Sequence, residues 1–241
     1  GLGHNSTMSK VSKAGASVEK TILNLDGDPN DPFAIFDDVK QFWENVNENK
    51  IKNAQKRKAE QAEWEKKNPE LAKKLAQFLS GNIPADIDFA SIEQKPNVAT
   101  RVASRTVLGY FAEHIENMIC SSADLSNSDN TDGFLKKTQD ITKDDFSGKF
   151  LEAGVAELTM ASIMNGIVLH GGLFTACGTF FVFSEYMKPA MRMSALMELP
   201  VKYVWSHDAF RVGEDGPTHQ PIEQEAQIRL MEQVYNHSGK R

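Results

Sequence analysis

The chain has 241 residues, which is enough for one or two domains with a sizeable hydrophobic core. Hydrophobic residues make up 40 % of it and charged residues 25 %, which excludes a disordered, collagenous or purely coiled-coil protein. The 27 Lys and Arg against 33 Asp and Glu give a net charge of −6, so no overall positive field is available to hold a nucleic acid. We therefore expect a folded protein that does not bind nucleic acid.

Residues 158–184 contain no Asp, Glu, Lys or Arg and are long enough to cross a membrane. However, Asn165, His170 and the pair Gly171-Gly172 divide this stretch into a helix-length piece and a strand-length piece. The pattern therefore predicts buried elements of a soluble fold, without membrane association.

The N-terminal end lacks the charged-then-apolar pattern of a secretory signal, and it begins with Gly, so we expect a piece of a longer protein. The two cysteines, Cys120 and Cys177, lie in apolar stretches without metal-ligand or disulfide spacing. This favours buried thiols and a cytoplasmic location.

The first part of the chain predicts a loop-rich segment followed by helices. Residues 1–30 show no sustained periodicity, whereas apolar residues from 31 onward recur at the three- and four-residue spacing of a helix. Lys50–Lys67 mixes both charge signs at helical spacing, which favours a solvated helix over a basic binding surface. Pro69 can open the next helix, which Ser80-Gly81 ends. Residues 31–81 thus predict a helical hairpin.

After residue 89 the sequence alternates between helical and strand patterns. The predicted elements are helices at about 98–114, 156–170 and 185–199, and strands at 118–123, 150–155, 173–181 and 201–206. Strands that are apolar on both faces, with helices between them, predict an α/β fold with a mostly parallel sheet and helices on both faces. Ligands of such sheets bind outside the carboxyl ends of the strands.

Three polar residues, Asp124, Glu157 and His207, fall just past predicted strands and would therefore gather at this edge. Glu157 precedes a helix whose side chains are almost all apolar apart from Asn165. Spacing alone favours a first-turn acid that interacts with the helix dipole. The alternative is a desolvated carboxyl group that shares a proton with a ring nitrogen.

Aromatic residues recur every three positions at Phe180, Phe183 and Tyr186, across a predicted strand-to-helix junction. Such a stripe is core by default, but at the binding edge of a sheet it could stack on a planar heterocycle. Periodicity leaves both interpretations open.

Residues 206–221 form a Gly- and Pro-punctuated loop rich in charged and histidine side chains. A zinc site at His207, Asp215 and His219 is disfavoured because the spacing matches no known type, and polar contacts to a hydroxylated substrate fit better. Arg101 could form a bidentate contact to a phosphate and Ser128 could add a hydroxyl donor, although each alone is typical of a surface.

Together these segments resemble the pyrimidine-binding domain of the transketolase family. The resemblance is carried by GVAELTMASIMNGIVLHGG, GTFFVFSEYMKPAMRMSALM and SHDAFRVGEDGPTHQPIEQ, with ATRVAS and SSADLSNSD in the order and spacing of the family. It implies that residues 1–30 are the tail of a preceding diphosphate-binding domain. Residues 31–88, with AEWEKKNPELA, would be the helical linker, and residues 89–241 a pyrimidine-binding domain that is incomplete at its C-terminal end.

The resemblance also implies roles for the candidate residues. Glu157 matches the catalytic glutamate that bonds N1′ of the aminopyrimidine of thiamine diphosphate, and Phe183 matches the aromatic residue that stacks on this ring. The other residues with implied roles are Asp124, Phe180 and Tyr186 for the cofactor, Arg101, Ser128 and His207 for the sugar phosphate, and Asp215 and His219 for the sugar hydroxyls. No metal ligand is implied in this chain, since Mg²⁺ would be bound by the diphosphate-binding domain.

The implied reaction is transfer of a two-carbon ketol unit from a ketose phosphate to an aldose phosphate, a step of the pentose phosphate pathway. The resemblance also implies a homodimer in which each active site lies between subunits. Because the GDG…N motif of the diphosphate-binding domain is absent, we expect a central fragment with half a site and no activity alone.

Three alternatives to a transketolase function remain. Deoxyxylulose-phosphate synthase has a related GxDGPTH loop but generally lacks the pair His207-Asp208, and dihydroxyacetone synthase shares the motifs. A non-catalytic regulatory module is favoured by Ala156, where transketolases usually carry Arg. It is opposed by the retention of Glu157 and of the loop histidines.

Overall fold

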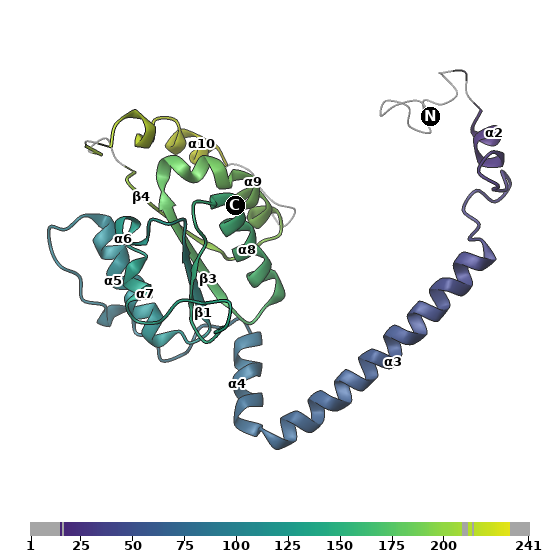
Figure 1. Ribbon diagram of the computed structural model, residues 1–241, viewed down its shortest axis with the longest axis horizontal. Helices are drawn as coiled ribbons and strands as arrows, with labels where there is room; N and C mark the ends of the chain where they lie inside the picture. The colour runs from purple at the N-terminus through teal and green to yellow at the C-terminus, as the bar shows by residue number, and fades with distance from the viewer. Residues whose placement is uncertain (1–14, 16, 209–211, 214, 232–241) are drawn as a thin grey trace. The chain divides into compact units, whose positions relative to one another are not determined.

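The computed structural model describes residues 15, 17–208, 212–213 and 215–231, and the chain forms two compact units, residues 1–69 and 70–241 (Figure 1). Most of the predicted tail, residues 1–14 and 16, lies outside the described residues, and the domain boundaries at 30/31 and 88/89 stay predictions. In chain order the elements are α2 (Val18–Leu23), α3 (Asp37–Lys67), α4 (Pro69–Leu79), η1 (Phe89–Ser91), α5 (Thr100–His114), β1 (Met118–Ser122), α6 (Ser126–Asp129), α7 (Asp132–Leu135), β2 (Phe150–Glu152), α8 (Glu157–His170), β3 (Phe174–Phe180), η2 (Phe181–Phe183), α9 (Ser184–Leu196), β4 (Lys202–Ser206), η3 (Pro217–His219) and α10 (Gln224–Met231).

The first unit consists mainly of α3, a helix of 31 residues with no buried residue. Ion pairs one turn apart, such as Lys52 with Glu48 and Lys56 with Glu60, run along it. The predicted solvated helix over Lys50–Lys67 is therefore confirmed. The helices expected on either side of Pro69 are also both present.

The second unit contains a sheet of four parallel strands in the order β2-β1-β3-β4. The predicted α/β class with a parallel sheet is confirmed. Strand β3 is central and six of its seven residues are buried, as expected for a strand covered on both faces.

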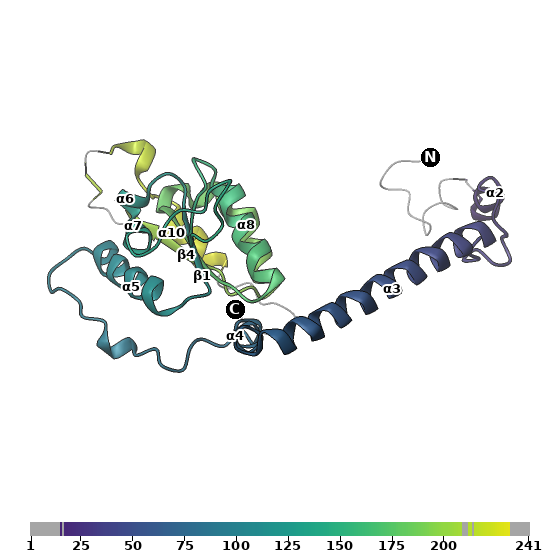
Figure 2. The ribbon, with the colours of Figure 1, turned by 60° about the horizontal axis from the view of Figure 1, so that its bottom comes forward.

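Two hydrophobic clusters, one on each face of the sheet, form the core. The first contains Phe134, Phe150 and Leu108 and lies under α5 and α7, whereas the second contains Met160, Met164 and further residues of α8 and α9. Figures 1 and 2 show α5 and α7 on one side of the strands and α8 on the other. The helices expected on both faces are thus present.

The sequence interpretation missed the short helices α6 and α7, which fall between the strands predicted at 118–123 and 150–155, and it missed α10. Strand β2 ends at Glu152, earlier than the predicted residue 155. The α7 helix depends on close packing: a Cβ atom at Gly133 would lie 2.3 Å from the carbonyl oxygen of Arg105 in α5. Such a tertiary requirement has no periodic signal in the sequence.

Candidate active site

Turns at the carboxyl ends of the strands form the site edge of the sheet. Asp124 follows β1 with a φ of 62°, and His207 follows β4 with a φ of 53°. Both are in the left-handed region, which costs free energy for residues other than Gly and is enriched at functional sites. The edge predicted from the sequence is therefore also a place of backbone strain.

A polar contact joins α5 to the end of β4. The Arg101 Nη1 atom lies 3.0 Å from Nε2 of His207 and donates to the Ser128 carbonyl oxygen at 3.2 Å. Because a guanidinium group has no acceptor, Nε2 must accept this hydrogen bond. The ring proton is then on Nδ1, which is 3.0 Å from Oγ of Ser206 and can donate to it.

The surroundings of His207 favour this neutral form. Burial lowers the pKa of His207 below its ordinary value, and the charges of Arg101 and His219 lower it further. The carboxylates of Asp215 and Asp208 act in the opposite direction. The electrostatic balance therefore agrees with the tautomer inferred from the hydrogen bonds.

The aromatic residues form one cluster with the two histidines. The rings of Phe180 and Phe183 are 5.9 Å apart and nearly parallel, and Tyr186 continues the stack at 6.1 Å from Phe183. His207 lies 3.7 Å from the Phe180 ring, and His219 contacts both phenylalanines edge-on. Phe180 is buried whereas Tyr186 is 62 % exposed, so the stack extends from the core to the surface.

A cleft of about 920 Å³ lies between the N-terminus of α5 and the end of β4. Arg101, His207 and Asp215 line it, together with Tyr203, Trp205 and other residues of the two elements. This volume is in the range of small-molecule sites. The cleft therefore offers a cation, a histidine and a carboxylate to one ligand.

Glu157 is the first residue of α8 and is only 7 % exposed. No other side chain or backbone group in the described part of the chain makes a hydrogen bond or ion pair with its carboxylate. Buried carboxylates are normally paired, because an unpaired one loses the solvation that water provides. This carboxylate therefore fits a ligand group that can share a proton with it.

The structure brings most of the predicted site residues together. A continuous set of contacts joins Arg101, Ser128, His207, Phe180, Phe183, Tyr186 and His219, and Asp215 lines the same cleft. Asp124 is exposed and Glu157 is buried. Neither makes a hydrogen bond, ion pair or ring contact with this set among the described residues.

Sequence reasoning missed two residues of this edge, Asp129 and Ser206. Both are buried, and both line the cleft. Asp129 belongs to the run SADLSNSDN, in which a short polar stretch follows a buried strand. Its position just after a predicted strand is the only sequence signal that could have identified Asp129 as a site residue.

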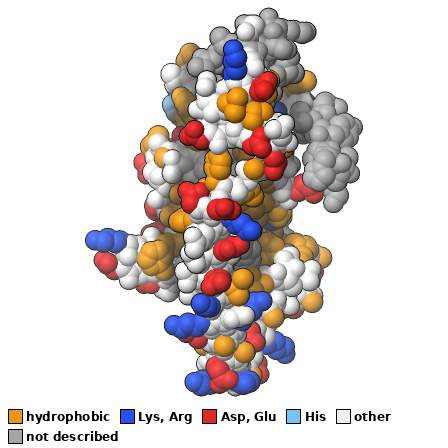
Figure 3. Space-filling model, turned by 90° about the vertical axis from the view of Figure 1, so that its right-hand side faces the viewer, with side chains coloured by type: hydrophobic (Ala, Val, Ile, Leu, Met, Phe, Trp, Pro, Cys, Tyr) orange, Lys and Arg blue, Asp and Glu red, His pale blue; other side chains and the backbone are white. Residues whose placement is uncertain are grey.

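The part of the chain that the structure describes contains neither a metal-ion cluster nor a membrane-spanning helix. Of the residues described, no group of three or more His, Cys, Asp or Glu could hold a metal ion. Likewise, the helices described include none that is long and apolar enough to span a bilayer. Figure 3 shows acidic and basic side chains intermingled on the face that it draws.

Comparisons with known proteins agree with this geometry. Residues 96–237 match the family described as transketolase, pyrimidine binding domain. A transketolase from Halalkalibacterium halodurans is 40 % identical over 201 residues, which are 83 % of this chain and 30 % of that protein.

Solved structures give the same result. Transketolase from Leishmania mexicana superposes with a TM-score of 0.77 at 31 % identity, over 87 % of this chain and 31 % of that one. A transketolase from Pichia stipitis, in complex with sedoheptulose 7-phosphate, superposes with a TM-score of 0.76 at 36 % identity. The match covers 88 % of this chain and 32 % of that one. The chain thus spans about 30 % of the length of these relatives. Since the family match covers the sheet, the cleft and every site residue described above, this chain belongs to the transketolase pyrimidine-binding-domain family.

Proposed function

We propose that this chain supplies the pyrimidine-binding half of a transketolase active site. The full-length protein would transfer a two-carbon ketol unit from a ketose phosphate to an aldose phosphate. The observation that carries the proposal is the buried carboxylate of Glu157, which lacks a partner in the described part of the chain and lies at the carboxyl edge of a parallel sheet.

The cofactor of this proposal is thiamine diphosphate, which when bound supplies the reactive carbon that carries the two-carbon unit. Glu157 would share a proton with a ring nitrogen of the pyrimidine, because its side chain is only 7 % exposed and its carboxylate has no other partner in the described part of the chain. Phe183, which is partly exposed beside Phe180 and Tyr186, would support the pyrimidine face, and Asp124 would lie beside the cofactor.

The sugar phosphate would bind in the cleft. Arg101 is in contact with His207 there, and Ser128 holds the arginine through its carbonyl oxygen, so a phosphate would meet a guanidinium group that is already in place. Asp215 and His219 would bond the hydroxyl groups near the reacting carbons. The Pichia stipitis relative, solved with a sugar phosphate, supports this substrate class.

The rest of the proposal concerns the assembly. Mg²⁺ and the diphosphate would be bound by a diphosphate-binding domain of a second subunit, in a homodimer, and this chain alone would be inactive. The buried and unpaired thiols of Cys120 and Cys177 favour the cytoplasm, where the pentose phosphate pathway operates.

Replacement of Glu157 by Gln in the full-length protein tests the proposal. The variant keeps the shape of the side chain but cannot take up a proton, so transfer from xylulose 5-phosphate to ribose 5-phosphate should fall by at least about a hundredfold. Exchange of the thiamine C2 proton, followed by NMR, should slow in parallel. The matched control is Glu113→Gln, because Glu113 is an exposed carboxylate paired with Lys137, outside the cleft.

The same assay distinguishes the alternatives. Unchanged C2 proton exchange in Glu157→Gln would contradict the assignment of this residue. Preference for formaldehyde as acceptor would identify a dihydroxyacetone synthase, although the contact between Arg101 and His207 favours a phosphorylated acceptor. Cofactor binding without any turnover by the wild-type protein would identify a regulatory module.

A further inference from the structure

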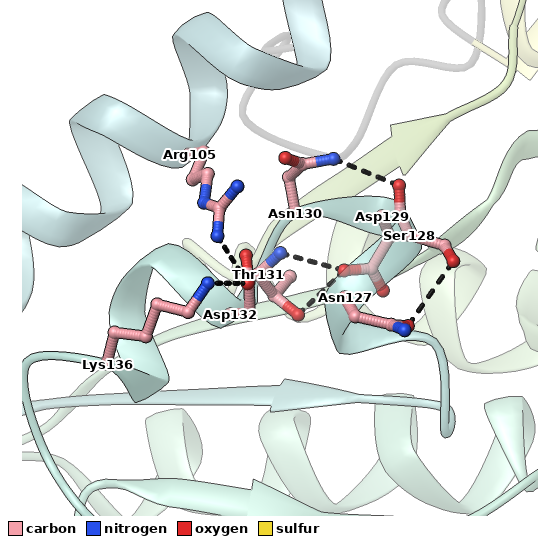
Figure 4. A network of polar contacts seen from close by, with 8 residues as sticks. All are labelled: Arg105, Asn127, Ser128, Asp129, Asn130, Thr131, Asp132 and Lys136. Carbon is pink, nitrogen blue, oxygen red and sulfur yellow. Dashed lines mark hydrogen bonds and ion pairs between the residues drawn. The ribbon is translucent and has the colours of Figure 1, made fainter.

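Asp129, at the end of α6, carries a fully buried carboxylate that accepts three hydrogen bonds. Its Oδ1 atom accepts from the backbone N–H of Thr131 at 2.8 Å and from the Thr131 hydroxyl at 2.7 Å (Figure 4). Its Oδ2 atom accepts from the hydroxyl of Ser122 at 2.7 Å, and the same hydroxyl oxygen accepts from the N–H of Leu125. One carboxylate thus ties the end of β1 to both ends of the turn formed by residues 125–131.

A second buried aspartate three residues later has a different environment. Asp132 forms ion pairs with Arg105 at 2.6 Å and with Lys136 at 2.5 Å (Figure 4). Asp129 has no such cationic partner among the described residues, and burial raises the pKa of its carboxyl group. Asp132 therefore anchors α7 to α5 by charge, whereas Asp129 acts only through the hydrogen bonds of the turn.

The turn leads directly to the cleft through Ser128. The carbonyl oxygen of Ser128 accepts hydrogen bonds from Nη1 of Arg101 at 3.2 Å and from the side-chain amide of Asn130 at 3.0 Å. Asn130 itself has a φ of 69°, a conformation that the turn must enforce. The direction of this carbonyl, and with it the position of the Arg101 guanidinium beside His207, depends on the shape of the turn.

The central strand β3 packs closely against the turn. A Cβ atom at Gly178 of β3 would lie 2.4 Å from Cγ2 of Thr131 and 3.0 Å from Oδ2 of Asp129. Gly178 pairs with Ser122 across the sheet, so strand, turn and carboxylate meet at one point. The turn therefore has little room to shift while Asp129 and its partners are in place.

We propose that Asp129 is a positioning residue: its buried carboxylate shapes the turn so that Ser128 holds Arg101 ready to bind the phosphate of a sugar phosphate. This inference rests on the function proposed above. It predicts that loss of Asp129 weakens the binding of phosphorylated substrates selectively, because the chemical step depends on Glu157 and the aromatic cluster.

The test uses the full-length protein with hydroxypyruvate as an unphosphorylated donor and either ribose 5-phosphate or glycolaldehyde as acceptor. Asp129→Ala removes all three hydrogen bonds and should raise the KM for ribose 5-phosphate about tenfold, while kcat and the KM for glycolaldehyde stay within about twofold of wild type. Asp129→Asn keeps an oxygen for Thr131 and should recover most of the affinity. Ser122→Ala removes one bond and should give a smaller rise of the same selectivity, even if Asp129→Ala does not fold.

The matched control is Asp132→Asn, a buried aspartate of the next helix that makes no contact with Ser128. It should lower the stability of the fold and leave the ratio of the two KM values unchanged. Equal changes for both acceptors in the Asp129 and Ser122 variants, or no change at all, would overturn the inference. A wild-type protein that transfers no two-carbon unit would instead overturn the proposed function, and the inference with it.

Discussion

Helices α3 and α8 are stabilised in opposite ways. The 31 residues of α3 include no buried side chain, and ion pairs and hydrogen bonds between successive turns accompany it, as between Gln61 and Glu65. Five of the 14 residues of α8 are buried. Glu157 is the only Asp, Glu, Lys or Arg in the whole helix. Local interactions therefore support α3, whereas packing against the sheet and α9 supports α8.

This difference indicates why the candidate catalytic residue lies on α8. A helix whose position is fixed by a close-packed core holds its first residue in a defined place, and Glu157 is only 7 % exposed there. Helix α3 has no buried residue and therefore offers no comparable position for a catalytic side chain. Substitutions in the two helices can test this interpretation.

The largest expected effect comes from Met164→Ala in α8. The Met164 side chain is completely buried between the sheet and α9, so its truncation should lower the free energy of unfolding of this unit by about 2–5 kcal/mol. Urea unfolding followed by tryptophan fluorescence, with Trp205 as the probe beside this cluster, provides the measurement. The control is Ile51→Ala in α3, where 56 % of the residue is exposed and little change is expected. If Ile51→Ala lowered the free energy of unfolding as much as Met164→Ala, the proposed difference between α3 and α8 would be wrong.

A smaller effect is expected from the polar network that joins α8 to α9 and β4. Asn165 donates to the Ala190 carbonyl oxygen, and its own oxygen accepts from Ser194 at 2.6 Å and from Tyr203 at 3.2 Å. Burial raises the pKa of Tyr203 to about 12, so its hydroxyl stays protonated and able to donate. Tyr203→Phe should therefore lower the free energy of unfolding by about 1 kcal/mol, measured by the same urea titration.

Tyr110→Phe is the control for this variant, because the Tyr110 hydroxyl accepts a single hydrogen bond, from the Asp88 backbone, at an exposed site. Its effect should be smaller than that of Tyr203→Phe. If the two variants were equally stable, the network would contribute no more than a surface contact, and packing alone would hold α8.

The comparison also explains what the sequence could predict. Both helices were expected, since α3 shows alternating charges at helical spacing and α8 a long uncharged run ended by Gly171. These patterns are local, and so are the apolar runs of the four strands. The strand order β2-β1-β3-β4 is not local, and no spacing in the sequence specifies which strands pair.

The same distinction applies to the site. Residues just past predicted strands, such as His207, were found because parallel strands end at one edge. The direct contact of Arg101 with His207 was not predicted, and the burial of Asp129 was missed, because the first joins residues 106 apart and the second depends on the close approach of Gly178 in β3. The helices α6 and α7, of four residues each, are likewise too short for periodicity.

The smallest effect is expected for the ion pairs of α3, such as Lys56 with Glu60 at 3.8 Å, whose side chains are 75 % and 63 % exposed. Lys56→Ala should change the hydrogen-exchange protection of the α3 amides by no more than about twofold, since exposed pairs one turn apart contribute little. The difference should vanish in about 1 M salt, because ions screen exposed charges. Glu44→Ala is the control, since Glu44 has no ion pair within the described residues. A large, salt-independent loss of protection would show that Lys56 is held by packing, and α3 would then resemble α8 after all.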